Sequence, residues 1–264
     1  MAEHNTFAGQ VAVITGAGVG IGKEIAQQLA LQGCAVLIND IDPALLQATA
    51  DEIRAQGGTV ESFPGDAGDV ATVQQMVTNA VDHFGRLDVA VANAGLTVWG
   101  SIFDYTPQMF EQLVAVNLRG SYFLTQAAAR QMRQQGHGGR ILLMSSVTAH
   151  QAIRFLSGYA MTKAALEMLA RNLVLELSPY GITINCVAPG ATVTPRNLAD
   201  DPEYEAVWSK VTPRGRPAST MDIAAAALFL LSPAAAHITG QSLVVDGGWT
   251  CVSETPHFHF VQTE

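Results

Sequence analysis

The sequence has few cysteines, few charged side chains and no long apolar run in its 264 residues. Its three cysteines, Cys34, Cys186 and Cys251, are far apart, which predicts reduced thiols of a cytosolic protein rather than a disulfide scaffold. The longest apolar run, residues 223–231, is less than half of the roughly 20 residues that a membrane-spanning helix needs. The first nine residues lack the pattern of a signal peptide. We therefore expect a cytoplasmic protein that does not enter a membrane.

Basic residues are scarce as well, since 14 lysines and arginines stand against 23 acidic residues and give a formal net charge of −9. This balance argues against nucleic acid or an anionic membrane as the main partner. Hydrophobic residues make up 48% of the chain, which excludes a disordered protein. No repeat or Pro/Ser-rich linker divides the sequence, so we predict one domain over residues 1–249 and a C-terminal extension over residues 250–264.

Short β-branched runs alternate with longer amphipathic ones along the chain. The short runs are continuously apolar, as strands buried on both faces are. They cover residues 11–15, 35–40, 59–63, 89–93, 140–145, 183–187 and 242–245. This alternation predicts an α/β fold with right-handed crossovers and a parallel sheet covered by helices on both faces. Ligands of such sheets bind beyond the carboxyl ends of the strands, so we expect the chemistry in the loops that follow them.

The first strand runs into a glycine-rich turn, residues 15–22, and a helix follows. A pyrophosphate binds to backbone N–H groups at a helix N-terminus that no side chain obstructs. The spacing GxxxGxG fits Gly16, Gly20 and Gly22, which favours a dinucleotide site over a plain glycine-rich turn. The candidate cofactor contacts in this turn are Gly16, Gly18, Val19, Gly20, Ile21 and Gly22.

The second strand ends at Asp40, whose carboxylate can accept hydrogen bonds from both adenosine ribose hydroxyls and would repel a 2′-phosphate. Because no Arg or Lys lies in the turn or at residues 39–43, we predict NAD in preference to NADP. The alternative for Asp40 is to cap the next helix, a role for which Asp42 is better placed. Further cofactor contacts are expected next to Asp40 and after the third and fourth strands, at Ile41, Asp66, Ala67, Asn93, Ala94 and Gly95.

Tyr159 and Lys163 are four residues apart in a helical pattern and therefore share one helix face. A neighbouring ammonium group and the positive ring of an oxidised nicotinamide would lower the pKa of the phenol from about 10, so that Tyr159 can take a proton from an alcohol. The alternative is an ordinary helical tyrosine with a solvated lysine. Ser146, which follows the fifth strand, would hold the substrate oxygen, and Asn117 would hold a water that links Lys163 to solvent.

The sixth strand leads into four further candidate cofactor contacts, Pro189, Gly190, Thr192 and Thr194, placed to meet the nicotinamide carboxamide. The substrate-binding site should be lined by residues 96–100, 147–157 and 191–215, and we expect the last stretch to act as a lid. The acidic residues at 200–205 are interpreted as a solvated helix start. The candidate substrate contacts are Thr97, Trp99, Ser146, His150, Arg154 and Tyr159.

Over about residues 7–249 these motifs resemble the short-chain dehydrogenase/reductase family. The matching segments are TGAGVGIG at 15–22, NAG at 93–95, YAMTK at 159–163, NCVAPG at 185–190 and DGG at 246–248. The resemblance implies a single Rossmann-type domain with a seven-stranded sheet, and hydride transfer between NAD(P) and a secondary alcohol or ketone. It also implies a catalytic tetrad of Asn117, Ser146, Tyr159 and Lys163, in which Lys163 also binds the nicotinamide ribose.

The resemblance further implies a homotetramer that pairs the helices near residues 107–135 and 158–178. Two positions depart from the family pattern. Ala92 stands where an asparagine is usual, and Thr192 stands where an aliphatic residue is usual, although its backbone N–H can still meet the cofactor.

The residues of the substrate-binding site favour a small polar substrate such as a polyol or sugar. A 3-oxoacyl thioester reductase is an alternative, although the sequence shows no basic patch that would dock an acyl carrier protein. A second alternative, a non-catalytic dinucleotide sensor, would typically have lost the tyrosine or lysine. No metal is expected, because His257 and His259 have no cysteine or carboxylate cluster beside them. The apolar residues around them predict that the extension packs on a neighbouring subunit.

Overall fold

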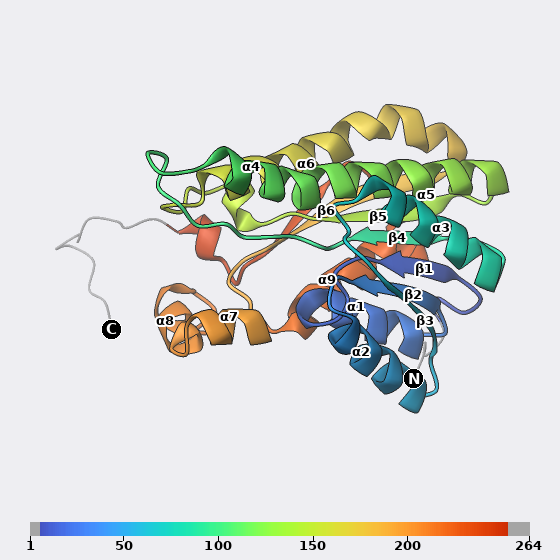
Figure 1. Cartoon of the computed structure of the whole chain (residues 1–264), viewed down its shortest axis with the longest axis horizontal. Coiled ribbons are helices and arrows are strands. Elements are labelled where there is room, and N and C mark those ends of the chain that lie inside the picture. Colours follow the sequence, from blue (N-terminus) through green and yellow to red (C-terminus); the bar gives the residue numbers. More distant parts are fainter. Residues whose placement is uncertain (1–5, 253–264) are drawn as a thin grey trace, which may run out of the picture.

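A sheet of seven parallel strands forms the middle of the molecule, in the order β3-β2-β1-β4-β5-β6-β7 (Figure 1). The computed structural model describes residues 6–252. Each strand agrees with the prediction to within two residues at either end, which confirms the doubly wound, Rossmann-type α/β fold. The strands are β1 Val11–Ile14, β2 Ala35–Asp40, β3 Thr59–Pro64, β4 Val89–Ala92, β5 Gly139–Met144, β6 Ile182–Pro189 and β7 Ser242–Val245.

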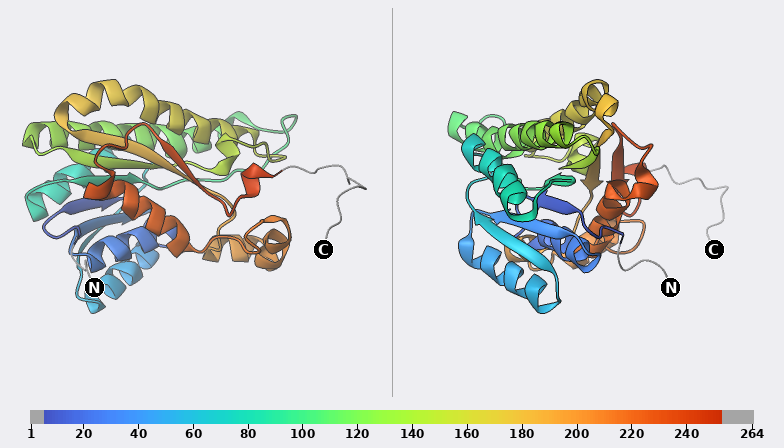
Figure 2. Two further views of the ribbon diagram at one scale, coloured as in Figure 1. Left: turned by 180° about the vertical axis from the view of Figure 1, so that it is seen from behind. Right: turned by 90° about the vertical axis from the view of Figure 1, so that its right-hand side faces the viewer.

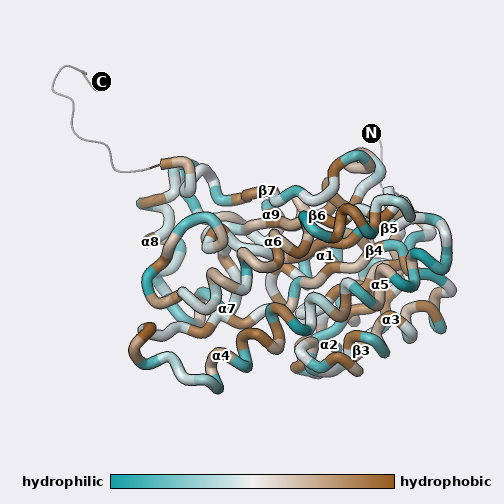
Figure 3. Tube along the Cα trace, turned by 90° about the horizontal axis from the view of Figure 1, so that it is seen from above, coloured by the Kyte–Doolittle hydropathy of each residue, from teal (hydrophilic) through white to brown (hydrophobic). Residues whose placement is uncertain are grey.

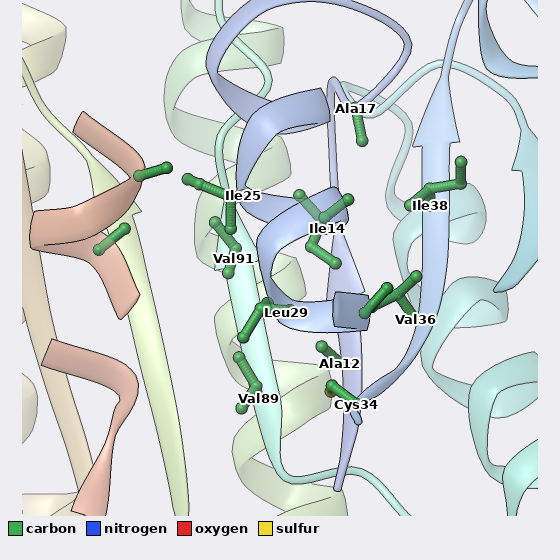
Figure 4. Packing of buried hydrophobic residues seen from close by; sticks show 14 of the residues in the cluster. Ala12, Ile14, Ala17, Ile25, Leu29, Cys34, Val36, Ile38, Val89 and Val91 are labelled. Atoms are coloured by element: carbon green, nitrogen blue, oxygen red, sulfur yellow. The ribbon is translucent and has the colours of Figure 1, made fainter. Parts of the chain in front are cut away.

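Helices cover both faces of this sheet, as the end-on view in Figure 2 shows. One face carries α1 (Gly20–Leu31), α2 (Pro43–Ala55) and α9 (Thr220–Leu231), whose buried residues share one core cluster. Ile25 and Leu29 lie one turn apart on α1 and pack against Ile14 and Val91 of the sheet (Figure 4). Burial of each such side chain contributes about 1.5–3 kcal/mol, so this face holds the glycine-rich turn firmly on β1.

The other face is covered by α3 (Val70–Phe84), α5 (Ser121–Gln135) and α6 (Ser157–Leu177). Its core cluster includes Met76, Leu124 and Leu166, one from each helix. Hydrophobic residues accordingly gather along the strands in the middle of the molecule (Figure 3). Within residues 6–252, no helix is both long and apolar enough to cross a membrane.

The predicted helical stretch near residues 107–135 has a π-helical turn in its middle. It consists of α4 (Pro107–Val114), the π-helix η1 (Ala115–Gly120) and α5, and Asn117 lies in η1. Such π-helical turns occur often at functional sites. This turn could not be predicted from the local sequence pattern, because the contacts that accompany it come from other parts of the chain.

Two short helices, α7 (Pro195–Asp200) and α8 (Tyr204–Val211), follow β6 and lie beyond one end of the sheet (Figure 1). Four short 3₁₀ helices complete the described chain: η2 Val147–Ala149, η3 Ser178–Tyr180, η4 Pro233–Ala235 and η5 Trp249–Cys251. The predicted docking segment around His257 and His259 lies outside the described residues, so that prediction stays untested.

Candidate active site

A cavity of about 1050 Å³ opens at the carboxyl ends of the strands. It extends from the glycine-rich turn to α8 and includes the place between β1 and β4 where the winding reverses. Of the predicted residues, the lining includes Gly16, Val19, Gly20, Ile21, Asp40, Ile41, Asp66, Ala67, Asn93, Ala94, Gly95, Thr97, Trp99, Ser146, Tyr159, Lys163, Pro189, Gly190, Thr192 and Thr194. Gly18, Gly22, Asn117, His150 and Arg154 are not part of it.

The glycines of the turn serve two purposes. Gly16 and Gly20 have φ angles of 63° and 69°, in the left-handed region that side chains disfavour. A Cβ atom on Gly22 would collide with the carbonyl oxygen of Gly16, and one on Gly18 would lie 2.8 Å from the carboxylate of Asp40. At Gly20 the nearest atom would be 3.7 Å away, so the cavity stays open there. Because α1 begins without a side-chain cap, its first N–H groups can bind an anion.

Replacing Gly22 by alanine is expected to lower the free energy of unfolding by roughly 1–3 kcal/mol, because the new methyl group overlaps Gly16 and the Asn93 amide. The distorted turn should also weaken binding of NADH. Urea unfolding and a fluorescence titration with NADH measure the two effects. Gly57→Ala is the control, since only its φ of 81° opposes the change and about 1 kcal/mol is expected with unchanged cofactor affinity.

Asp40 is held in place by two backbone groups. Its Oδ2 accepts from the Gly18 N–H at 2.9 Å and its Oδ1 accepts from the Asp42 N–H at 3.1 Å. Asp42 is the residue that caps α2, because its carboxylate accepts from Ala44 and Leu45. Asp40 is thus not the helix cap, and its carboxylate faces the cavity with lone pairs to spare for ribose hydroxyls.

Asn93 joins the end of β4 to the glycine-rich turn. Its Nδ2 donates to the carbonyl oxygens of Thr15 at 3.0 Å and Gly16 at 2.9 Å. The Thr15 hydroxyl in turn accepts from the N–H groups of Asn93 and Ala94, both at 3.1 Å. These bonds fix the floor of the cavity between β1 and β4.

Tyr159 and Lys163 lie on the first turns of α6, beside Ser146 at the end of β5. Lys163 is buried below the tyrosine ring, with its Nζ 5.4 Å from the ring centroid and donating to the Met144 carbonyl at 2.7 Å. The side chains of Ser146 and Thr97 lie close enough to the Tyr159 hydroxyl to lower its pKa. A substrate oxygen between Ser146 and Tyr159 would therefore meet two hydroxyl groups.

Burial dominates the ionisation of this pair. It raises the pKa of Tyr159 above 10, against the lowering effect of the nearby Ser146 and Thr97 side chains and of the positive charge of Arg196. Burial also lowers the pKa of Lys163 from 10.5 to about 8. The protein alone therefore does not lower the pKa of the phenol as predicted, because Lys163 faces a carbonyl group and not the hydroxyl. A bound positive nicotinamide ring would have to supply the lowering.

Asn117 lies fully buried behind the cavity and holds the loop that follows β4. Its Oδ1 accepts from the Leu96 N–H at 2.8 Å, while its Nδ2 donates to the Leu96 carbonyl at 3.0 Å and to the Thr162 hydroxyl at 3.1 Å. Gly95 separates this amide from Lys163, and a Cβ there would lie 3.3 Å from Nζ. Asn117 thus fixes the backbone next to Lys163.

The backbone N–H of Thr192 donates to the Tyr204 hydroxyl at 3.2 Å, and the Thr192 hydroxyl donates to the Gly190 carbonyl. In this structure its N–H is therefore not turned to a cofactor. The Thr194 hydroxyl caps α7 by accepting from the Asn197 N–H at 3.2 Å.

Two predicted substrate contacts lie elsewhere. His150 Nε2 is 2.9 Å from Glu167 Oε1, a buried carboxylate oxygen that also accepts from the hydroxyls of Ser145 and Ser242 at 2.8 Å. The Arg154 guanidinium lies 5.1 Å from the centroid of the neighbouring Phe155 ring. The structure therefore brings neither side chain to the cavity.

The structure adds lining residues that the sequence interpretation missed. Arg196, Asn197, Asp200 and Asp201 of the α7 region line the cavity, and both aspartates are also exposed to solvent, as predicted for this acidic segment. These residues could have been found from their position after the sixth strand, because residues 191–215 are predicted to line the substrate site. Spacing alone does not say which side of a six-residue helix faces inward.

A family model described as "Enoyl-(Acyl carrier protein) reductase" matches residues 16–250. The chain is 40% identical to an L-rhamnose 1-dehydrogenase (NAD(P)(+)) of Azotobacter vinelandii, over 89% of this chain and 94% of that protein. A second L-rhamnose 1-dehydrogenase (NAD(P)(+)), from a Sphingomonas species, is 39% identical over 91% and 96% of the two chains. The chain belongs to the short-chain dehydrogenase/reductase family.

Solved structures agree with this assignment. The fold is similar to that of a 7α-hydroxysteroid dehydrogenase in complex with NADH and 7-oxo glycochenodeoxycholic acid, with a TM-score of 0.88 and 36% identity. That similarity covers 94% of this chain and 98% of the other. As a short-chain dehydrogenase/reductase, the protein is an oxidoreductase that acts on CH–OH groups with a nicotinamide cofactor.

Proposed function

We propose that this short-chain dehydrogenase/reductase oxidises a secondary alcohol of a small polar substrate with NAD, and that Tyr159 is the general acid/base. The observation that carries the proposal is the single cavity with Asp40 at one end and Tyr159, Ser146 and Lys163 at the other. The open backbone at Gly20 and the uncapped start of α1 lie between the two ends and fit a pyrophosphate.

The residues divide the chemistry as follows. Ser146 orients the substrate hydroxyl, and Tyr159 takes its proton, which passes on to solvent. When bound, the nicotinamide ring would accept the hydride from the carbon that carries this hydroxyl. Lys163 would bind the nicotinamide ribose, and the positive charge of the bound ring would favour the phenolate of Tyr159. Asn117 holds the loop that closes over Lys163 and keeps a water path open to solvent.

Asp40 is expected to make the enzyme prefer NAD over NADP. In Asp40→Ala, loss of hydrogen bonds between a charged group and the ribose should raise KM for NAD about tenfold or more and narrow the preference for NAD by a similar factor. The kcat/KM ratio for the two cofactors measures this. Asp82→Ala, an exposed carboxylate on α3, is the control. A wild-type protein that already prefers NADP would contradict the role of Asp40.

The substrate class favoured is a polyol or sugar, because two similar proteins are L-rhamnose 1-dehydrogenases. The Arg, Asn and Asp side chains of α7 at the cavity support a hydroxyl-rich ligand. A spectrophotometric screen of sugars, polyols, hydroxy acids, steroids and 3-oxoacyl thioesters tests it. Turnover of thioesters alone would favour the alternative reductase.

A homotetramer is also proposed, since α5 and α6 carry large exposed apolar side chains: Tyr122, Met161, Met168 and Leu175. Such a surface is typical of a subunit interface. Sedimentation at micromolar concentration should give about four times the chain mass of 27.9 kDa, and a monomer would contradict the proposal.

A further inference from the structure

Arg196 reaches across the mouth of the cavity from the first turn of α7. Its Nη2 donates to the Thr97 carbonyl at 3.4 Å, and its Nε lies 4.0 Å from Asp200 Oδ2. The side chain is 50% exposed and lines the cavity. It thus connects the loop after β4 with the helix after β6, directly over the substrate end.

The guanidinium lies close to the catalytic hydroxyl. Thr97, whose carbonyl accepts from Arg196, also has its side chain near the Tyr159 hydroxyl, whose pKa it lowers. The positive charge of Arg196 lowers the pKa of Tyr159. Lys163 lies against the ring of Tyr159. Arg196 thus lines the cavity near Tyr159, where groups attached to the reacting carbon would lie.

Most of the donors of Arg196 are left for a ligand. A guanidinium carries five N–H donors in a planar fork. Among the described residues, Arg196 makes only the one hydrogen bond to Thr97. A donor pair of this shape fits the two oxygens of neighbouring hydroxyl groups or of a carboxylate.

The charges around Arg196 distinguish these two ligands. Asp200 and Asp201 line the same part of the cavity, so the three side chains together carry one net negative charge. A substrate carboxylate would gain one attraction and meet two repulsions. An uncharged hydroxyl-rich molecule can accept from Arg196 and donate to the aspartates.

We propose that Arg196 is a specificity-determining residue that binds the hydroxyl group next to the reacting carbon and selects an uncharged, hydroxyl-rich substrate. This inference rests on the proposed function and adds the substrate class. It assigns to Arg196 the role that the sequence suggested for Arg154.

The experiment compares Arg196→Met with wild type on L-rhamnose, on its 2-deoxy analogue, and on cyclohexanol. Removal of the guanidinium should raise KM for L-rhamnose about ten- to a hundredfold. With wild type, KM for the 2-deoxy analogue should exceed KM for L-rhamnose by a similar factor. With Arg196→Met, the two KM values should differ little, because the substitution and the missing hydroxyl remove the same interaction. KM for NAD should not change, and the pH at which kcat/KM reaches half its maximum should rise.

Two further variants complete the design. Lys210→Met, on α8 and outside the lining, removes an equivalent exposed charge and should leave KM unchanged. Arg196→Lys should restore the pH profile but not the KM for L-rhamnose, since a lysine lacks the fork. Wild type should also prefer D-galactose over D-galacturonate, the matched charged sugar.

If wild type oxidises L-rhamnose, each of three results would overturn the inference: equal KM values for Arg196→Met and wild type, a larger effect of Arg154→Met, or a preference for the uronate. If wild type oxidises cyclohexanol but no sugar, the proposed dehydrogenase function stands and the inference fails. If it oxidises none of these or other alcohols, the proposed function itself fails.

Discussion

Tyr159→Phe is expected to lower kcat by about 10² to 10⁴, the range that a general acid/base contributes, and to leave the affinity for NADH nearly unchanged. The phenylalanine ring keeps the packing over Lys163 and removes only the hydroxyl near Ser146 and Thr97. Steady-state kinetics with the best alcohol of the screen and a fluorescence titration with NADH measure the two quantities.

Tyr180→Phe is the matched control, because Tyr180 is exposed, lies under Arg133 and is remote from the cavity. The kcat of Tyr180→Phe should equal that of wild type. A Tyr159→Phe protein that retains more than about a tenth of the wild-type kcat would show that another group moves the proton.

Lys163→Met is expected to abolish most activity and yet stabilise the fold at neutral pH. The fall in pKa from 10.5 to about 8 means that burying the charged form costs about 3 kcal/mol. Losing the hydrogen bond to the Met144 carbonyl costs about 1 kcal/mol. The variant should therefore gain about 2 kcal/mol at pH 7, while kcat/KM falls at least about a hundredfold.

The gain should depend on pH with a defined sign. Between about pH 8 and 10.5 Lys163 is neutral in the folded chain and charged in the unfolded chain, so the unfolded state binds more protons. The free energy of unfolding of wild type therefore rises with pH across that window. As pH falls through 8, Lys163 becomes charged in the folded chain too and this contribution is lost. The advantage of Lys163→Met is full below pH 8 and should be close to zero near pH 9.5.

Urea unfolding of both proteins at pH 7 and pH 9.5 measures this difference while the other titrating groups cancel. Lys23→Met is the control, because Lys23 forms a surface ion pair with Glu52 at 2.7 Å that is worth at most about 1 kcal/mol. A lower free energy of unfolding for Lys163→Met than for wild type at pH 7 would contradict this prediction. It would mean that Lys163 stabilises the folded protein.

The sequence was sufficient for the parts of the protein that depend on short-range pattern. Strands buried on both faces are mostly apolar, so β1 and β6 could be located to within one or two residues, although Thr183 and Asn185 interrupt the apolar run of β6. Asp40 could be placed because a strand end and a glycine turn are adjacent in this sheet topology. Catalytic roles of Tyr159 and Ser146 remain predictions that kinetics must test.

Side-chain direction in irregular segments could not be predicted. His150 follows Ser146 by four residues, yet its ring binds the buried carboxylate of Glu167 and does not line the cavity. Arg196 lies on the six-residue helix α7, and sequence spacing does not determine which side of so short a helix lines the cavity. The direction of the Tyr159 pKa was also missed, because burial depends on elements far apart in the sequence.

A crystal structure with bound NAD tests most directly whether one cavity holds the whole dinucleotide between Asp40 and Tyr159. We predict the adenosine ribose on the Asp40 carboxylate, the pyrophosphate on Gly20, and the nicotinamide ring beside Tyr159. A carbinol carbon should then fit roughly 3–3.5 Å from the reactive ring carbon and within reach of the phenol oxygen. A nicotinamide ring bound away from Tyr159, beyond the reach of its hydroxyl, would contradict the assignment of Tyr159 as the proton carrier.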